Sequence, residues 1–138
     1  MKKIAVWAVL LLIAAGAAGC KKTEKAIMEE ETSLSSNSAI NKEISSLKDK
    51  LSSAKDDFAK SEIIGKISDL QSQKGDFGQA VKSANESIKL YPGLAMPHYV
   101  LGKSYLASGR FTEAEFELQT AVGTDENLQP AYLDIGNV

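Results

Sequence analysis

The 138-residue chain has room for one small domain beside a targeting segment, and aromatic residues make up only 7% of it, so its core must be built mainly from Ala, Leu, Ile and Val. The formal charge is −2 and the lysines are scattered rather than gathered in a basic stripe, which argues against nucleic-acid binding. The single cysteine, Cys20, excludes an intrachain disulfide and a thiolate zinc cluster.

The first 19 residues have the layout of a secretory signal. Lys2 and Lys3 provide a basic start, and residues 4–19 are all apolar or small. This apolar run of 16 residues is shorter than the roughly 20 that a membrane-spanning helix needs. It ends in Ala17-Ala18-Gly19-Cys20, which resembles the lipobox of bacterial lipoproteins, with Ala17 where leucine is common.

The lipobox resemblance implies that residues 1–19 are a lipoprotein signal peptide and that Cys20 is lipidated. Palmitate-type acyl chains would then hold the protein at the membrane. An uncleaved signal anchor that contains one cysteine is the alternative. Lys21 stands where, in the better-known sorting rule, an aspartate retains lipoproteins at the inner membrane. The resemblance therefore favours the bacterial cell envelope, at the periplasmic face of the outer membrane.

The next segment is predicted to be a flexible tether over residues 20–38, because charged residues are followed by a run of small polar ones that cannot form a core. Ser38 could cap a helix over residues 39–60. That helix would carry an apolar stripe with spacings of 4, 3, 4, 3 and 4 residues, formed by Ile40, Ile44, Leu47, Leu51, Ala54 and Phe58. Two interpretations stay open: a homo-oligomer through residues 40–58, or an amphipathic helix that packs against the next part of its own chain. The stripe is shorter than three heptads, which favours the second.

The rest of the chain is an internal repeat. Residues 61–94 align without a gap on residues 95–128, and four of the matched pairs are Ile67/Leu101, Gly75/Gly109, Phe77/Phe111 and Ala80/Ala114. Ile135-Gly136 begins a third unit, 34 residues after Leu101-Gly102. This pattern resembles the tetratricopeptide repeat, a helix-turn-helix unit of 34 residues. The resemblance implies an all-α solenoid of about 2.3 repeats, with residues 129–138 as the first helix of a third repeat or as a capping helix.

The repeated residues have physical roles. Gly75 and Gly109 are expected to end the first helix of each pair in a left-handed conformation. Phe77 and Phe111 should open the second helix and pack into the gap between the two. Gly102 is small because the two helices of its pair should cross closely there.

The C-terminal helix lacks the polar outer face expected of the last helix in an array. Its apolar residues are Ala131, Tyr132, Leu133, Ile135 and Val138. We therefore expect the chain to be an N-terminal fragment of a longer protein; a poorly capped array is the alternative.

No catalytic constellation emerges from the sequence. His98 is the only histidine, and it occupies a packing position of the repeat, so a Cys-His or Ser-His-Asp arrangement would depend wholly on it. We expect no enzyme activity, no metal site and no cofactor.

The resemblance implies instead that ligands contact fixed positions of the first helix in each repeat. Those positions include Glu62, Asp69, Gln73, Met96, Tyr99, Lys103, Leu106 and Asn137. Tyr99 and Leu106 would anchor a peptide, and Asp69 and Lys103 would fix its register; ordinary repeat surface is the alternative. The predicted function is an adaptor or assembly factor that binds a protein or peptide segment of an envelope complex. The competing predictions are a structural, oligomerising spacer and a fragment whose active part lies elsewhere.

Overall fold

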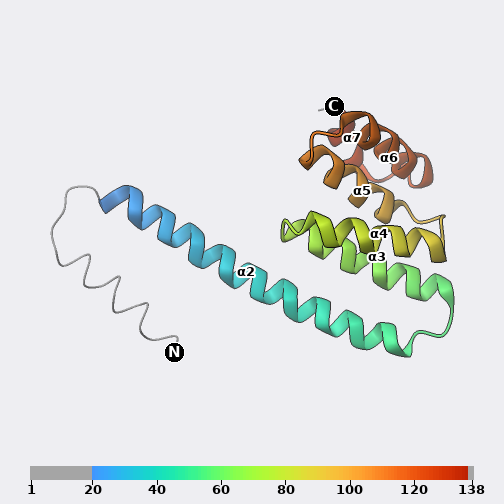
Figure 1. Cartoon of the computed structure of the whole chain (residues 1–138), viewed down its shortest axis with the longest axis horizontal. Helices are drawn as coiled ribbons and strands as arrows, with labels where there is room; N and C mark the ends of the chain where they lie inside the picture. The colour runs from blue at the N-terminus through green and yellow to red at the C-terminus, as the bar shows by residue number, and fades with distance from the viewer. Residues whose placement is uncertain (1–19, 137–138) are drawn as a thin grey trace. The chain divides into compact units, whose positions relative to one another are not determined.

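The computed structural model describes residues 20–136, which form six helices joined by short connections (Figure 1). The predicted signal peptide, residues 1–19, lies outside this range, as do Asn137 and Val138. Within the range, no helix is both long enough and apolar enough to cross a membrane. The prediction of an all-α fold is confirmed.

The first described helix, α2 (Cys20–Ser53), runs through the segment predicted to be a tether. The prediction of a flexible tether over residues 20–38, with a helix that starts only at residue 39, is therefore wrong. Hydroxyl groups on this helix donate to carbonyls three residues earlier, as Thr32 does to Glu29 and Ser33 to Glu30, both at 2.9 Å. These bonds keep small polar side chains compatible with helix. The chain divides after Ser38 into two units, and the repeats lie wholly in the second.

The boundary between α2 and the repeats also differs from the prediction. Helix α2 ends at Ser53, and α3 (Asp57–Gln73) begins after Asp56, whose side chain accepts a hydrogen bond from Ala59 N at 2.8 Å. Phe58 therefore belongs to α3, and no single helix spans residues 39–60. An aspartate at the N-cap position satisfies a free backbone N–H of the first turn, so it starts a new helix even where the apolar spacing continues.

Within the second unit, the later part of α2 lies beside α3 (Figure 1). Ile44 is only 8% exposed, and Asn41 Oδ1 accepts a hydrogen bond from Lys74 Nζ at 3.1 Å. Ile40, Leu47 and Leu51 are half-buried. The apolar stripe thus contributes to the fold of its own chain, which favours the packing interpretation. Self-association through residues 40–58 stays a prediction.

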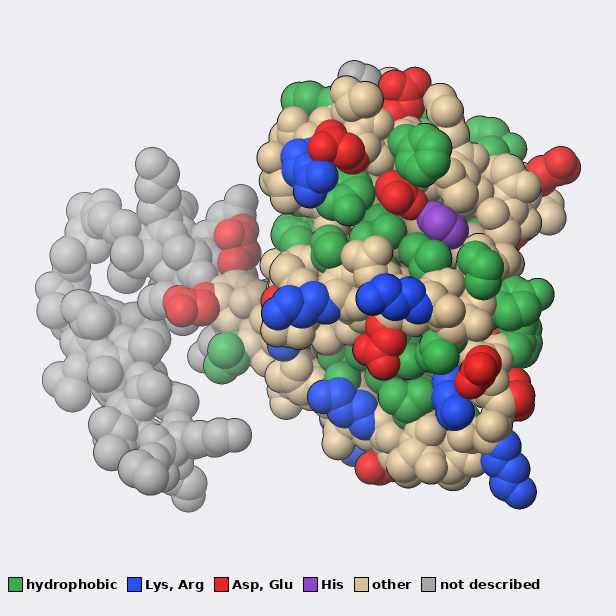
Figure 2. Space-filling view, turned by 45° about the vertical axis from the view of Figure 1, so that its right-hand side comes forward, with side chains coloured by type: hydrophobic (Ala, Val, Ile, Leu, Met, Phe, Trp, Pro, Cys, Tyr) green, Lys and Arg blue, Asp and Glu red, His purple; other side chains and the backbone are tan. Residues whose placement is uncertain are grey.

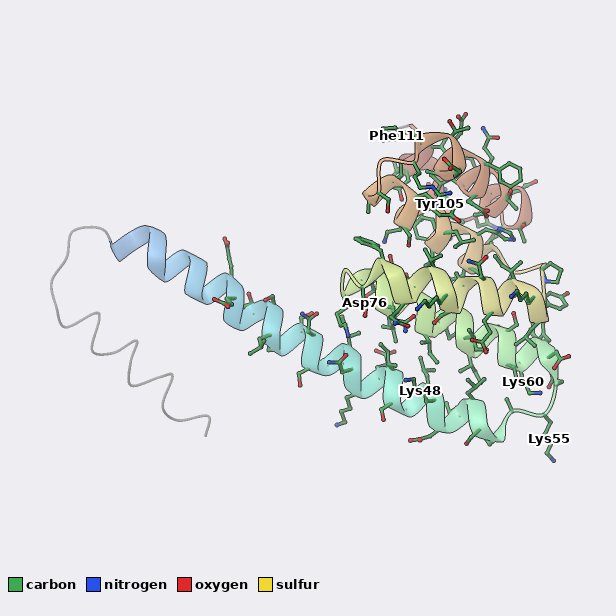
Figure 3. The ribbon with its side chains drawn as sticks, viewed as in Figure 1. Lys48, Lys55, Lys60, Asp76, Tyr105 and Phe111 are labelled. Carbon is green, nitrogen blue, oxygen red and sulfur yellow. The ribbon has the colours of Figure 1, made fainter. Side chains whose placement is uncertain are left out.

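The repeats form two antiparallel helix pairs and one further helix. The first pair is α3 with α4 (Phe77–Leu90), the second is α5 (Ala95–Ala107) with α6 (Phe111–Thr124), and α7 (Gln129–Ile135) packs on α6. The first helices, α3 and α5, also contact each other, and α5 packs on α4 as well. Asp76, at the start of α4, marks the turn of the first pair (Figure 3).

Both helix pairs turn at a left-handed glycine, as predicted. Gly75 has a φ of 81° and Gly109 a φ of 71°. The next residue of each turn bonds back across five residues, Asp76 N to Gln71 O and Arg110 N to Tyr105 O, each at 2.9 Å. The two turns are therefore the same helix-ending motif, which glycine adopts without a steric penalty.

The core is built from small side chains that bring the helices close together. One cluster contains Ala80, Ala84, Val100 and Leu101; another contains Tyr99, Leu118, Ala121 and Ala131. A Cβ atom on Gly102 would lie only 2.6 Å from Leu118 Cγ and 3.3 Å from the Ala114 carbonyl oxygen. The expected close crossing at Gly102 is therefore confirmed.

The two phenylalanines that open the second helices are not equally covered. Phe77 is half-buried, whereas Phe111 is 56% exposed at the start of α6 (Figure 3). The prediction that Phe111 fills the gap between helices is wrong. The 13-residue α5 packs over the first pair, but α7 has only seven residues to cover the second. Other hydrophobic side chains also reach the surface of the repeats (Figure 2).

Candidate functional site

The residues predicted to line a groove lie on the first helices, α3 and α5, with Asn137 outside the described residues. On α3, Glu62 and Gln73 are exposed and Asp69 is half-buried. Gln73 Nε2 donates a hydrogen bond to Asp69 Oδ2 at 2.9 Å. These three side chains therefore belong to one polar surface, and Glu62 is free to meet a partner at its edge.

Tyr99 differs from the expectation of a free aromatic anchor. It is 9% exposed and packs with Leu118, Ala121 and Ala131. Burial raises the pKa of its hydroxyl to about 12, helped by the charge of Asp134 on α7, a hydrogen bond to that carboxylate, and the charge of Asp69. Tyr99 is buried because α7 packs beside it, so it supports the binding surface instead of forming it.

The remaining predicted residues on α5 fall into two groups. Lys103 places Nζ 5.3 Å from the centre of the Tyr99 ring, close enough for a cation–π contact. Leu106 packs against the cluster around Tyr99, and Met96 packs against both core clusters. Met96, one of the predicted groove residues, also lines an open cavity, whereas the predicted anchors Tyr99 and Leu106 are not among the residues that line it.

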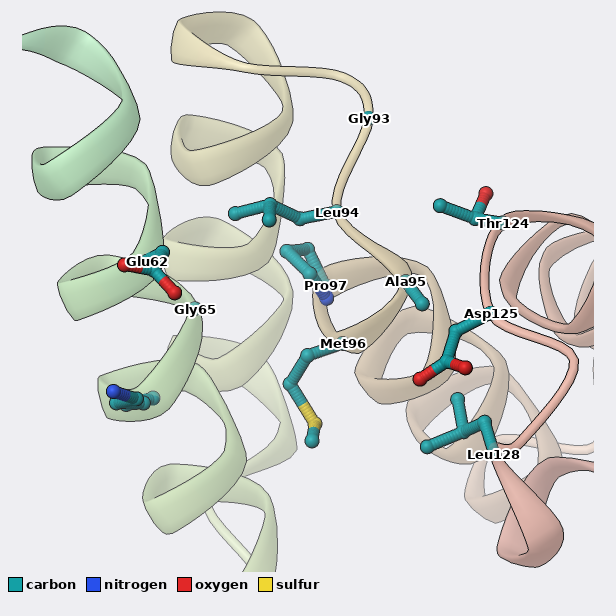
Figure 4. A pocket seen from close by; sticks show the side chains of 11 residues that line it. Glu62, Gly65, Gly93, Leu94, Ala95, Met96, Pro97, Thr124, Asp125 and Leu128 are labelled. Atoms are coloured by element: carbon teal, nitrogen blue, oxygen red, sulfur yellow. The ribbon is translucent and has the colours of Figure 1, made fainter.

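That cavity is a pocket of about 320 Å³ at the start of α5 (Figure 4). Its walls come from α3, from the connection before α5, from the first turn of α5 and from the turn between α6 and α7. The lining residues are Glu62, Gly65, Lys66, Gly93, Leu94, Ala95, Met96, Pro97, Thr124, Asp125 and Leu128. Glu62 and Met96 were predicted; the loop residues were missed, because helix positions alone do not reveal where connections fold back over a groove.

The floor of the pocket is closely packed at a glycine of α3. A Cβ atom on Gly65 would lie 3.4 Å from Pro97 Cγ and 3.4 Å from Ser87 Oγ, already at the edge of van der Waals contact. A longer side chain at this position would enter the space between α3 and α5. Gly65 therefore forms part of the floor of the pocket, where α3 packs closely on Pro97 and Ser87.

The chemistry of the pocket suits binding. Met96 and Leu128 offer apolar surface, and the charged groups of Glu62 and Lys66 lie at exposed positions of the rim. Such a mixture buries an apolar group while a few polar groups fix its orientation.

His98 has a packing partner, as its position in the repeat predicts. Its Nδ1 lies 2.7 Å from Glu117 Oε2, and the two side chains are 13% and 17% exposed. This contact joins α5 to α6. In the described part of the chain, no group of three or more His, Cys, Asp or Glu residues is placed to hold a metal ion.

Comparison with known families matches the helix pairs. Residues 61–93 and 97–128 match the tetratricopeptide repeat. The two helix pairs are thus similar to tetratricopeptide repeats. Comparison with curated proteins gave no match. Tetratricopeptide repeats are protein–protein interaction modules and typically non-catalytic scaffolds, which agrees with the pocket and the polar surface on α3 and α5.

Proposed function

We propose that this protein is a membrane-anchored adaptor of the bacterial cell envelope whose tetratricopeptide repeats hold a segment of a partner protein. The observation that carries the proposal is the pocket between α3, α5 and the α6–α7 turn. At about 320 Å³ it is near the lower end of the size range of ligand pockets, roughly 300–1,000 Å³. It therefore suits one or two side chains of a peptide.

The position of the pocket supports an extended partner segment. The polar surface of α3 begins beside the pocket at Glu62, and Asp69 and Gln73 follow Glu62 along the helix. A peptide could place an apolar side chain beside Met96 and Leu128 while its backbone and polar groups meet this surface. Apolar anchors surrounded by a polar rim are the usual arrangement of protein interfaces.

Membrane attachment is proposed through Cys20, the first residue of α2. The lipobox-like sequence before Cys20 supports acylation, and Lys21 supports the outer membrane. Two or more acyl chains give stable attachment. Full-length protein should partition into membranes and incorporate a fatty-acid label, and Cys20→Ser should lose the label. Label incorporation that persists in Cys20→Ser would refute lipidation at this site.

The partner-binding proposal is tested by photo-crosslinking in producing cells. A crosslinking amino acid at Lys66, on the pocket rim, should give a discrete product with another protein. The same amino acid at Lys82, an exposed residue of α4, is the matched control. Glu62→Arg should remove the product from position 66 because it reverses the charge at the pocket edge. A product that forms equally from Lys82, or that survives Glu62→Arg, would contradict binding at the pocket.

A further inference from the structure

A second surface stands out on the side of α6 that faces away from the core. Phe116 is 67% exposed and Phe111 is 56% exposed. Helix α6 buries Ala114, Leu118 and Ala121 completely. The packing of the helix therefore uses neither phenylalanine, and both rings remain in contact with water.

The first repeat provides an internal comparison. The residue 34 positions before Phe116 is Lys82, which is exposed on α4. The fold of the repeat thus accepts a charged residue at this position, and nothing in the packing requires an aromatic one. Exposed aromatic surface that the fold does not need is a mark of an interaction site.

Acidic side chains outnumber basic ones around these aromatic residues, where Arg110 is the exposed basic neighbour. Residues 111–136 contain six acidic side chains and no lysine or arginine, whereas residues 54–110 contain eight basic and six acidic ones. Glu113 and Gln119 lie three residues before and after Phe116, so they are its neighbours on the helix surface. Acidic and hydrophobic side chains also lie close together around the histidine on the face shown in Figure 2.

The neighbouring carboxylates are held in place. Arg110 donates to Glu113 Oε1 at 2.9 and 3.0 Å, and Gln119 Nε2 donates to Glu115 Oε1 at 3.1 Å. Glu113 and Glu115 remain exposed, so each can accept further hydrogen bonds. We define the outer face of α6 as two adjacent strips of its exposed surface: Glu113, Phe116 and Gln119 at three-residue spacing, and Phe111 and Glu115 four residues apart.

We propose that the outer face of α6 docks a basic amphipathic segment of a partner protein. Apolar side chains of that segment cover Phe116 and Phe111, and its lysines or arginines meet Glu113 and Glu115. A second copy of this face would bring like charges together, and an anionic membrane surface would be repelled. Complementary charge therefore selects a basic partner. This surface lies apart from the pocket and does not depend on it.

The probe is an 18-residue helical peptide of leucine and lysine with one tryptophan, and its matched control has glutamate in place of lysine. The protein is the chain from position 20 with Cys20→Ser, which keeps every described helix and needs no detergent. The sole tryptophan of the sequence is Trp7, so peptide fluorescence reports binding without protein background. The lysine peptide should bind and the glutamate peptide should not.

Substitutions then locate the binding surface. Phe116→Ser should weaken binding of the lysine peptide by about tenfold or more, because it removes a central aromatic anchor. Glu115→Lys should also weaken it. Glu86→Lys is the matched control, because it makes the same charge change on an exposed residue of α4. The change in the logarithm of Kd caused by Glu86→Lys should be less than about a third of the change caused by Glu115→Lys. Circular dichroism checks that each variant is folded.

Several outcomes would overturn the proposal. Equal weakening by Glu115→Lys and Glu86→Lys would mean that net charge alone attracts the peptide. An unchanged affinity of Phe116→Ser for the lysine peptide would show that Phe116 is not an aromatic anchor. Loss of binding only in Glu62→Arg would place the peptide in the pocket. A dimer in light scattering that Phe116→Ser dissociates would assign the face to a second copy of the chain.

Discussion

The contact between Gly102 on α5 and Leu118 on α6 predicts that a serine at position 102 destabilises the protein. A Cβ atom there would lie 2.6 Å from Leu118 Cγ and 2.8 Å from Leu118 Cδ2. Carbon atoms in contact stay about 3.5–4.0 Å apart. Leu118 has no exposed surface, so it cannot turn outward without displacing its neighbours.

The first repeat shows how the conflict is avoided. The residues 34 positions earlier are Ser68 and Ala84, both fully buried, and Ser68 Oγ donates to Gly65 O at 2.7 Å. A larger residue on one helix is thus matched by a smaller one on the other. Gly102→Ser combined with Leu118→Ala recreates this pair in the second repeat.

The magnitudes separate the outcomes. Overpacking a core costs about 1–3 kcal/mol, and replacing a helical glycine by serine returns roughly 0.5 kcal/mol. Gly102→Ser should therefore cost about 0.5–2.5 kcal/mol of unfolding free energy. Leu118→Ala leaves a cavity and should cost about 2–5 kcal/mol. In the double variant the clash disappears, so its cost should fall below the sum of the two by at least about 1 kcal/mol.

The assay is urea denaturation followed by circular dichroism, on the chain from position 20 with Cys20→Ser and on its three variants. Comparable slopes against urea are needed before the free energies are subtracted. If the two costs add within about 0.5 kcal/mol, the residues do not share space and the packing argument fails. The reverse exchange, Ala84→Leu with and without Ser68→Gly, repeats the test in the first repeat.

Three further predictions concern the turns, the tyrosine and α2. Gly109→Ala should lower the unfolding free energy by about 1–2 kcal/mol, because its φ of 71° disfavours a Cβ; Gly123→Ala, near the end of α6 with open space around it, should be neutral or stabilising in the same thermal melt. The pKa of Tyr99 is raised to about 12, above the roughly 10 of an unfolded tyrosine, so its contribution to stability is present below pH 10 and is lost as the pH rises towards 12. Absorbance at 295 nm should show one tyrosine that ionises late, and Tyr99→Phe should remove it; four normal titrations would contradict the burial. Ile44→Asp should destabilise the fold by about 2 kcal/mol or more, whereas Leu34→Asp, at a position that is 71% exposed, should not. Light scattering tests self-association through residues 40–58, because Leu47→Asp should lower the mass of an oligomer that forms there. The same mass for Leu47→Asp and for the unmodified protein would exclude self-association through these residues.

The repeats could be predicted from sequence because their signals are local. The 34-residue spacing places Gly75 and Gly109 at equivalent turns, and both have positive φ. A left-handed glycine followed by a phenylalanine marks the same helix-turn-helix in each repeat. The small residue Gly102 likewise predicts, from the sequence alone, that the two helices of its pair cross closely.

Other features depend on information that spacing does not contain. The apolar stripe continues to Phe58, yet a capping bond from Ala59 N to Asp56 places a break inside it. Side-chain hydrogen bonds such as that of Thr32 keep a polar segment helical. Exposure on the first helices is set by neighbours: Tyr99 is buried by α7, whereas Glu62 stays open. The repeat position of a residue therefore predicts its helix but not its freedom to bind.

The pocket illustrates how packing limits the evolution of binding. Ser61 and Ser87 are fully buried and bond reciprocally, each hydroxyl donating to the other's carbonyl at 2.9 and 2.8 Å. Leaving either group unpaired would cost about 1–3 kcal/mol, so the pair fixes α3 against α4. The Ser87 hydroxyl also limits the space beside Gly65, as Pro97 does from the other side. The floor of the pocket thus cannot change without disturbing the repeat, and variation in partner preference is expected at rim residues such as Glu62.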